Sequence, residues 1–133
     1  MAVYLVATNS AERSELLCDY LAPRVDDADL VHAVNSKRGG DDTTQGDLRR
    51  GKEALAVVET RLSHKTTVET HQLVRGNDPA EDLLGFADRN GVDELVIGVR
   101  NRSVAAKLVF GSVAEDVLLN ADRPVRVVPT PEA

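Results

Sequence analysis

Short apolar runs alternate with helical patterns along the whole chain, and this alternation restricts the fold more than any other feature. Helical patterns of about ten or more residues separate the runs. This order favours right-handed crossovers and a parallel sheet with helices on both faces, which is a three-layer α/β/α fold. The five predicted strands cover residues 3–7, 30–34, 66–74, 95–99 and 125–128.

Local signals mark the ends of several elements. Ser10 is expected to cap the first helix, and Asp78-Pro79-Ala80-Glu81 matches a capping box that opens the third helix. The third strand is more polar than the others, so we expect it at an edge of the sheet. Residues 35–45 contain Gly-Gly and Asp-Asp pairs and are expected to form an exposed loop.

Residues 93–115 combine a strand, two glycines and a helix start in a pattern that suits a phosphate. Gly98 falls near the end of the fourth strand, and Gly111 and Ser112 precede the last helical pattern. Glycine lets backbone N–H groups approach a ligand closely, and a helix N-terminus offers free N–H donors and a partial positive charge. We therefore expect an anion to bind where these two segments meet.

Two parts of this pattern have a second interpretation. Ser112 also opens a capping box, in which its side chain accepts from the backbone N–H of Glu115 without any ligand. A solvated loop would explain each nearby cation separately, namely Arg100, Arg102 and Lys107. Because three positive charges lie together in an acidic chain, we expect at least one of them to contact a phosphate.

The chain resembles the universal stress protein family over residues 4–128. The resemblance rests on Gly98 at the end of the fourth strand and on Gly111-Ser112 at the family's spacing before the last helix. Residues 74–81 are similar to the family's turn into its third helix, and residues 123–128 are similar to its last strand. The resemblance implies a five-stranded parallel sheet with the order 3-2-1-4-5, as in adenine nucleotide alpha hydrolase-like proteins.

In that strand order the chain changes direction between the first and fourth strands. Open α/β sheets bind ligands at the carboxyl ends of the strands that flank such a point. Those ends are residues 7–10 and 98–102, and the resemblance implies that ATP, with or without Mg²⁺, binds there. The candidate cofactor-binding residues are Thr8, Asn9, Ala33, Gly98, Arg100, Asn101, Gly111, Ser112 and Val113.

The resemblance also implies roles for these residues. The glycines, Ser112 and Val113 would surround the phosphates and ribose, and Ala33 would lie near the adenine. Thr8 replaces a family aspartate and is expected to keep a weaker hydrogen bond to the ligand. Asn101 replaces the family's second glycine; asparagine tolerates positive φ better than other non-glycine residues, so we expect the turn to persist.

Size and charge exclude several classes of protein. A chain of 133 residues forms one domain, residues 1–133, with a sizeable core. Its net charge of −6 argues against a nucleic-acid surface. No apolar run reaches the length of a membrane span, no signal peptide is evident, and the single Cys18 suits a reducing environment, so we expect a cytoplasmic protein without membrane contact.

Catalytic and metal-binding patterns are not found in the sequence. The three histidines, His32, His64 and His71, show no ligand spacing with Cys18 or with carboxylates, so structural roles are expected for them. No nucleophile lies beside a base, and neither a P-loop lysine motif nor a dinucleotide fingerprint is present. We therefore expect neither an enzyme nor a metal protein.

Two functions remain open. The first is an ATP-binding stress-response or signalling module that works through nucleotide occupancy. The second is a nucleotide-free interaction protein of the same fold, because branches of the family without the glycine motif do not bind ATP. It would act as a homodimer through the last strand, where Val125, Val127 and Val128 are expected to offer apolar surface and free backbone groups.

Overall fold

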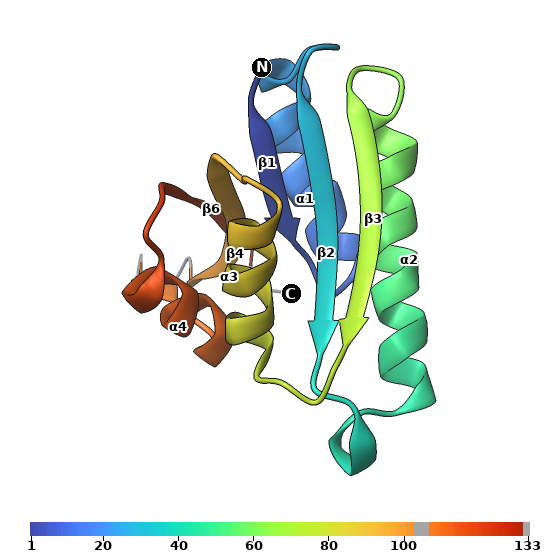
Figure 1. Ribbon diagram of the computed structural model, residues 1–133, viewed down its shortest axis with the longest axis vertical. Helices are drawn as coiled ribbons and strands as arrows, with labels where there is room; N and C mark the ends of the chain where they lie inside the picture. Colours follow the sequence, from blue (N-terminus) through green and yellow to red (C-terminus); the bar gives the residue numbers. More distant parts are fainter. Residues whose placement is uncertain (103–106, 132–133) are drawn as a thin grey trace.

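The computed structural model describes residues 1–102 and 107–131. Five parallel strands form one sheet with the order β3-β2-β1-β4-β6 (Figure 1). This is the predicted order 3-2-1-4-5, and the predicted fold class is confirmed. The parallel strands are β1 Val3–Ala7, β2 Leu30–Lys37, β3 Thr67–Val74, β4 Glu94–Arg102 and β6 Val125–Pro131.

Helices cover both faces of the sheet, as the crossovers require. The first pair, α1 (Ala11–Leu21) and α2 (Gln45–Leu62), lies on one face; the second pair, α3 (Pro79–Arg89) and α4 (Ser112–Asn120), lies on the other (Figure 1). Short 3₁₀ turns follow α1 and β2, at Ala22–Arg24 (η1) and Gly40–Asp42 (η2). In the part of the chain that the structure describes, no helix is both long and apolar enough to cross a membrane.

The sheet separates two apolar cores because successive side chains of a strand point to opposite faces. Val6, Val31 and Val96 point toward α1 and α2, where they join Leu17 and the buried side of α2. The residues one step along these strands, such as Leu5 and Leu95, belong to a second core with α3 and α4. Each strand therefore supplies both cores, which explains its near-continuous apolar sequence.

The region after Gly98 differs from the loop that the sequence predicts. β4 continues to Arg102, and β5 (Lys107–Val109) pairs with it in antiparallel orientation. The turn expected at Asn101 is wrong, because its backbone pairs with Leu108 on β5 and with Pro131 on β6. Two neighbouring strands provide backbone partners there, which keeps the chain extended.

Three expected caps have different outcomes. Ser10 caps α1 by accepting a hydrogen bond from the backbone N–H of Arg13, as predicted. The capping boxes predicted at Asp78 and Ser112 are wrong, because neither helix start has a side-chain cap and Gly111 is the N-cap of α4. Asp78 instead accepts from Arg38 at 3.3 Å, which ties α3 to the end of β2.

The two edges of the sheet differ in chemistry. β3 is an edge strand, as predicted, with exposed Thr67, Glu69 and Thr70. β6 pairs with β4 alone among the described residues, so it forms the opposite edge. The expectation that Val128 offers surface is wrong, because Val128 is buried in the core beside α1 and α2.

Candidate functional site

A cleft of about 270 Å³ opens at the carboxyl ends of β1 and β4. It therefore lies at the point where the strand order changes direction, as expected for an open α/β sheet. Its size is close to the lower end for small-molecule sites, which begin at about 300 Å³. The lining residues come from seven elements and their flanking loops: Ala7–Asn9, Arg13, Val34–Arg38, Asp42, Thr43, Pro79, Leu83, Ile97, Gly98, Val113, Ala114 and Val117.

The inner walls of the cleft are apolar. Val34 and Ile97 come from the sheet, Leu83 comes from α3, and Val117 comes from α4. All four side chains are buried, so they belong to the core as well as to the cleft. Walls of this kind suit the flat face of a base or another apolar ring, with polar groups at the rim to orient it.

Arg13 reaches the cleft across the bare backbone of Gly98. A Cβ atom at position 98 would lie 3.3 Å from both Cδ and Nε of Arg13 and 3.4 Å from Cγ2 of Thr130. Burial lowers the pKa of Arg13, and the nearby charge of Arg100 lowers it further. An anion placed here would offset both effects, because it would interact favourably with the charged guanidinium.

A second hollow adjoins the cleft and shares Asn9, Arg13 and Lys37 with it. Arg100, Arg50 and Asp47 also line this hollow, and Arg50 forms an ion pair with Asp47. Arg13, Lys37 and Arg100 thus bring three positive charges to one side of the site. Such a group of cations favours phosphate or carboxylate ligands.

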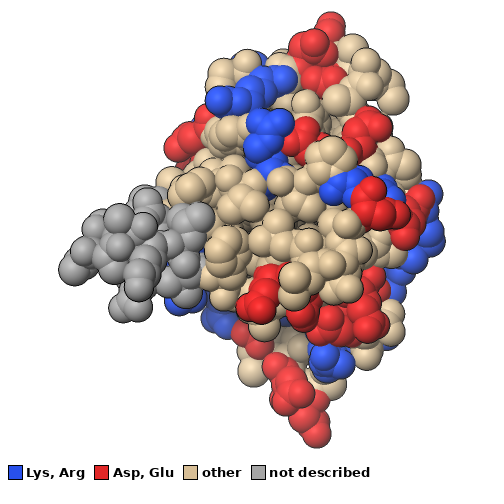
Figure 2. Space-filling model, turned by 90° about the vertical axis from the view of Figure 1, so that its left-hand side faces the viewer, with Lys and Arg blue, Asp and Glu red and all other residues tan. Residues whose placement is uncertain are grey.

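The surface near α3 and α4 has the opposite character. Figure 2 shows this side of the molecule with an uncharged middle and prominent acidic side chains in its lower half. The first turns of the two helices carry the exposed Glu81 and Glu115. The cations of the cleft therefore contrast with an acidic neighbourhood, as expected from the net charge of −6.

A buried hydrogen-bond network fixes the floor of the cleft. The Ser14 hydroxyl donates to the carbonyl of Ala54 at 2.8 Å, so its contact of 2.7 Å with Thr8 Oγ1 uses the Thr8 proton. Asn35 Nδ2 donates to the Thr8 carbonyl at 2.9 Å. The Thr8 hydroxyl is therefore already engaged inside the protein, which leaves it an acceptor toward a ligand.

The structure brings part of the predicted set together. Thr8, Asn9, Gly98 and Val113 line the cleft, and Arg100 lines the adjoining hollow. Ala33 is fully buried in the core beside α1 and α2, and its neighbour Val34 lines the cleft instead.

The remaining predicted residues lie at or beyond the rim. Gly111 and Ser112 are exposed at the start of α4, directly before Val113. Asn101 and Arg102 continue β4, and Lys107 begins β5, so their backbones are placed but their side chains lie outside the described part of the structure.

Sequence reasoning missed several residues that the fold places at the site or near it. Arg13 and Lys37 line the cleft, although neither belongs to a motif. The position of Arg13 in the first turn of α1, directly after β1, was a usable signal, because that turn faces the ligand-binding end of the sheet.

A cluster of His32, Glu69 and His71 lies elsewhere on the sheet, outside the cleft. The sequence showed no metal-ligand spacing between the histidines and a carboxylate, but the fold brings His32 and His71 close to Glu69. β2 and β3 pair in register, with His32 opposite Glu69, and this register brings the three side chains together.

Known proteins with similar structures cover almost the whole chain. A universal stress protein from Archaeoglobus fulgidus is 32% identical, with a TM-score of 0.74 and coverage of 96% of this chain and 98% of that chain. A structure of the universal stress protein from the same organism in complex with dAMP is 29% identical, with a TM-score of 0.67 and coverage of 96% and 97%.

Sequence comparisons agree with the structural ones. A universal stress protein of Methanocaldococcus jannaschii is 33% identical over 82 residues, which is 62% of this chain and 48% of that protein. The chain spans about half the length of the curated relatives it matches. The model of the universal stress protein family matches residues 5–129. The chain belongs to the universal stress protein family.

Proposed function

We propose that the protein binds an adenine nucleotide, ATP with Mg²⁺ in the first instance, in the cleft at the ends of β1 and β4. The observation that carries the proposal is the pairing of apolar walls with cations in one cleft at the strand switch point. Val34, Leu83 and Ile97 suit the adenine, and Arg13 and Lys37 suit the phosphates. The dAMP complex of the related Archaeoglobus protein supports the same class of ligand.

Asp42 offers a place for the metal ion that accompanies a triphosphate. Its side chain is exposed and lines the cleft from η2, near Lys37 and Arg38. Mg²⁺ prefers one or two carboxylates together with phosphate oxygens and water. Asp42 would therefore complete a site that the nucleotide itself largely supplies.

The proposed role is binding and signalling rather than turnover. Among the described residues that line the cleft, Asp42 is the single carboxylate, and no histidine, cysteine or glutamate lies there to pair with a nucleophile. The thiol of Cys18 lies in the core, where burial raises its pKa to about 11. Occupancy of the cleft would act through η2 and the first turn of α4, since Asp42 and Val113 line it.

Thermal unfolding with nucleotides tests the proposal. ATP with Mg²⁺ at a hundred times its dissociation constant is expected to add about 2.7 kcal/mol of stability. AMP is expected to stabilise less, because it offers fewer phosphate oxygens to the cations, and adenosine least. No stabilisation by any of the three, in the wild type or in the double variant Thr8→Asp/Asn101→Gly, would contradict nucleotide binding.

A nucleotide-free homodimer is the second candidate, supported by the edge position of β6. Val125 and Val127 are half-buried, and no second strand pairs with β6 among the described residues. Val127→Glu is expected to shift the molecular mass in light scattering from two chains to one, because a carboxylate would be buried at the pairing edge. The exposed Leu119→Glu on α4 serves as control, and a wild-type monomer at all concentrations would exclude this candidate.

A further inference from the structure

A group of possible metal-ligand side chains lies on the sheet beside the proposed nucleotide cleft but outside it. His32 comes from β2, and Glu69 and His71 come from β3. The parallel register pairs His32 with Glu69 and Val34 with His71, so the three side chains lie on one face of two neighbouring strands. None of the three lines the cleft.

The distances between the ligand atoms fit one metal ion. His32 Nδ1 and His71 Nε2 lie 3.1 Å apart, and Glu69 Oε1 lies 4.0 Å from the first and 3.9 Å from the second. A point at the centre of this triangle is about 2.1 Å from each atom, which matches Zn–N and Zn–O bonds of about 2.0–2.2 Å. An ion could therefore enter with little movement of the side chains.

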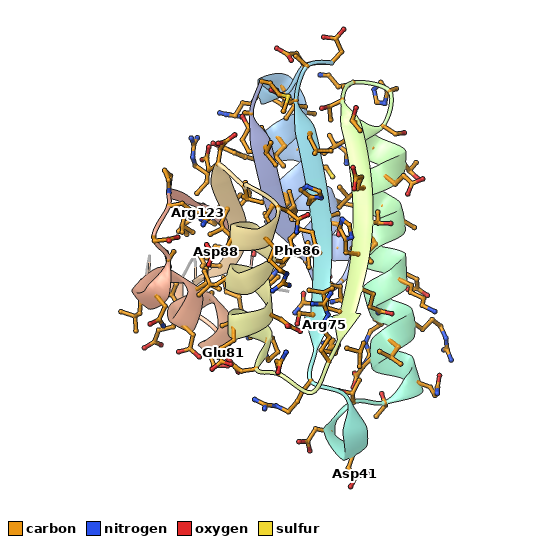
Figure 3. The ribbon with its side chains drawn as sticks, in the orientation of Figure 1. Asp41, Arg75, Glu81, Phe86, Asp88 and Arg123 are labelled. Atoms are coloured by element: carbon orange, nitrogen blue, oxygen red, sulfur yellow. The ribbon has the colours of Figure 1, made fainter. Side chains whose placement is uncertain are left out.

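The surroundings hold the two imidazole rings in place. Phe86 of α3 contacts both, with ring centroids 5.2 Å from His32 and 4.7 Å from His71. Figure 3 shows Phe86 between α3 and the strands. His32 is almost fully buried, whereas the Glu69 side chain is 52% exposed, so an ion could enter from the solvent beside β3.

The His32 and His71 rings share a hydrogen bond at 3.1 Å, which a bound ion would replace with two metal–nitrogen bonds. Both contacts of Glu69 with the rings are close to 4 Å, which is too long for a hydrogen bond. Two imidazoles and a carboxylate form a donor set that binds Zn²⁺ in known proteins, with a fourth position left to water. We propose that His32, Glu69 and His71 bind a divalent transition-metal ion, Zn²⁺ in the first instance, which joins the edge strand β3 to β2.

Calorimetric titration with ZnCl₂ tests the proposal on the full chain, without a histidine tag, after chelator treatment and without nucleotide. One Zn²⁺ per chain is expected to bind, and a hundredfold excess over the dissociation constant should raise the Tm by about 8 °C. His71→Ala is expected to weaken binding at least 100-fold, and Glu69→Gln at least tenfold. The matched control is His64→Ala, which removes an exposed histidine outside the cluster and should bind as the wild type.

Several outcomes would overturn the site. These are a stoichiometry well below one, Glu69→Gln binding like the wild type, or a loss of binding in His64→Ala. Glu69 is largely exposed, so its variant keeps the fold and decides the question even if His71→Ala unfolds. Cobalt provides a second readout, because Co²⁺ at this site should show the visible absorption of a four-coordinate ion. Because the titration contains no nucleotide, its result does not depend on whether the proposed cleft binds one.

Discussion

Gly51→Ala is expected to lower the free energy of unfolding by about 3 kcal/mol, because overpacking and a broken buried hydrogen bond each cost about 1–3 kcal/mol. Gly51 lies on the buried side of α2. A Cβ atom there would lie 2.0 Å from Oδ1 of Asn35 and 2.6 Å from Nε2 of Gln72. Both distances are far below van der Waals contact, so the two side chains would have to move.

The side chains that would move have fixed partners. Gln72 Nε2 donates to Asn35 Oδ1 at 3.1 Å and to the Leu48 carbonyl at 2.9 Å. Asn35 is 1% exposed and also donates a hydrogen bond to the Thr8 carbonyl. Water therefore cannot replace a hydrogen-bond partner that Asn35 loses. The higher helix propensity of alanine contributes about 1 kcal/mol of stability, which is less than the expected destabilisation.

Urea unfolding followed by circular dichroism measures this change. Gly85→Ala in α3 is the matched control, because its new Cβ would meet only the flexible end of Arg89, at 3.0 Å. That variant is expected to be unchanged or more stable by up to about 1 kcal/mol. Equal stability of the two variants would show that the Asn35–Gln72 network tolerates a methyl group and that the packing described here is wrong.

Arg13→Met is expected to weaken the binding of ATP by about 10- to 100-fold. A hydrogen bond to a charged group contributes about 1.5–3 kcal/mol, and methionine keeps the apolar stem of the side chain while removing the charge. Gly98 leaves room for the guanidinium beside the cleft, so the charge lies where the phosphates are proposed to bind. Adenosine affinity should change less than threefold, because adenosine has no phosphate.

Isothermal titration at two salt concentrations measures the Arg13 effect. The difference between wild type and variant should narrow at high salt, because mobile ions screen a partly exposed charge. Arg49→Met, an exposed position of α2 outside the cleft, is the control and should bind as the wild type. Equal losses for ATP and adenosine would assign Arg13 a packing role and remove it from the phosphate site.

Patterns along the chain were enough for the fold but not for all of the site. Apolar periodicity located the five parallel strands, and the family resemblance supplied their order. The sequence did not predict the short strand β5, because its residues, 107–109, are too few to show a periodic pattern. The cap at Asp78 failed because local sequence does not report a competing partner such as Arg38, and the cap at Ser112 failed because the helix begins after Gly111.

Site residues that depend on pairing between elements could not be read from the sequence. Thr8 follows β1, Gly98 lies in β4 and Val113 lies in the first turn of α4, and the family resemblance was enough to name all three. The contact of Arg13 with Gly98 requires α1 to lie against the end of β4. The meeting of His32 with Glu69 requires a specific register between β2 and β3, and a shift of one residue would place the two side chains on opposite faces.

The unlike edges of the sheet limit how copies of the chain can assemble. An edge strand that displays charged and hydroxylated side chains resists addition of another strand, and β3 displays Glu69 together with Thr67 and Thr70. β6 carries the half-buried Val125 and Val127, and the charge of Arg126 between them is paired with Glu94 at 2.8 Å. In a dimer that paired through β6, as proposed above, this edge would be occupied in both copies, so assembly would stop at two chains and no fibre could continue from it.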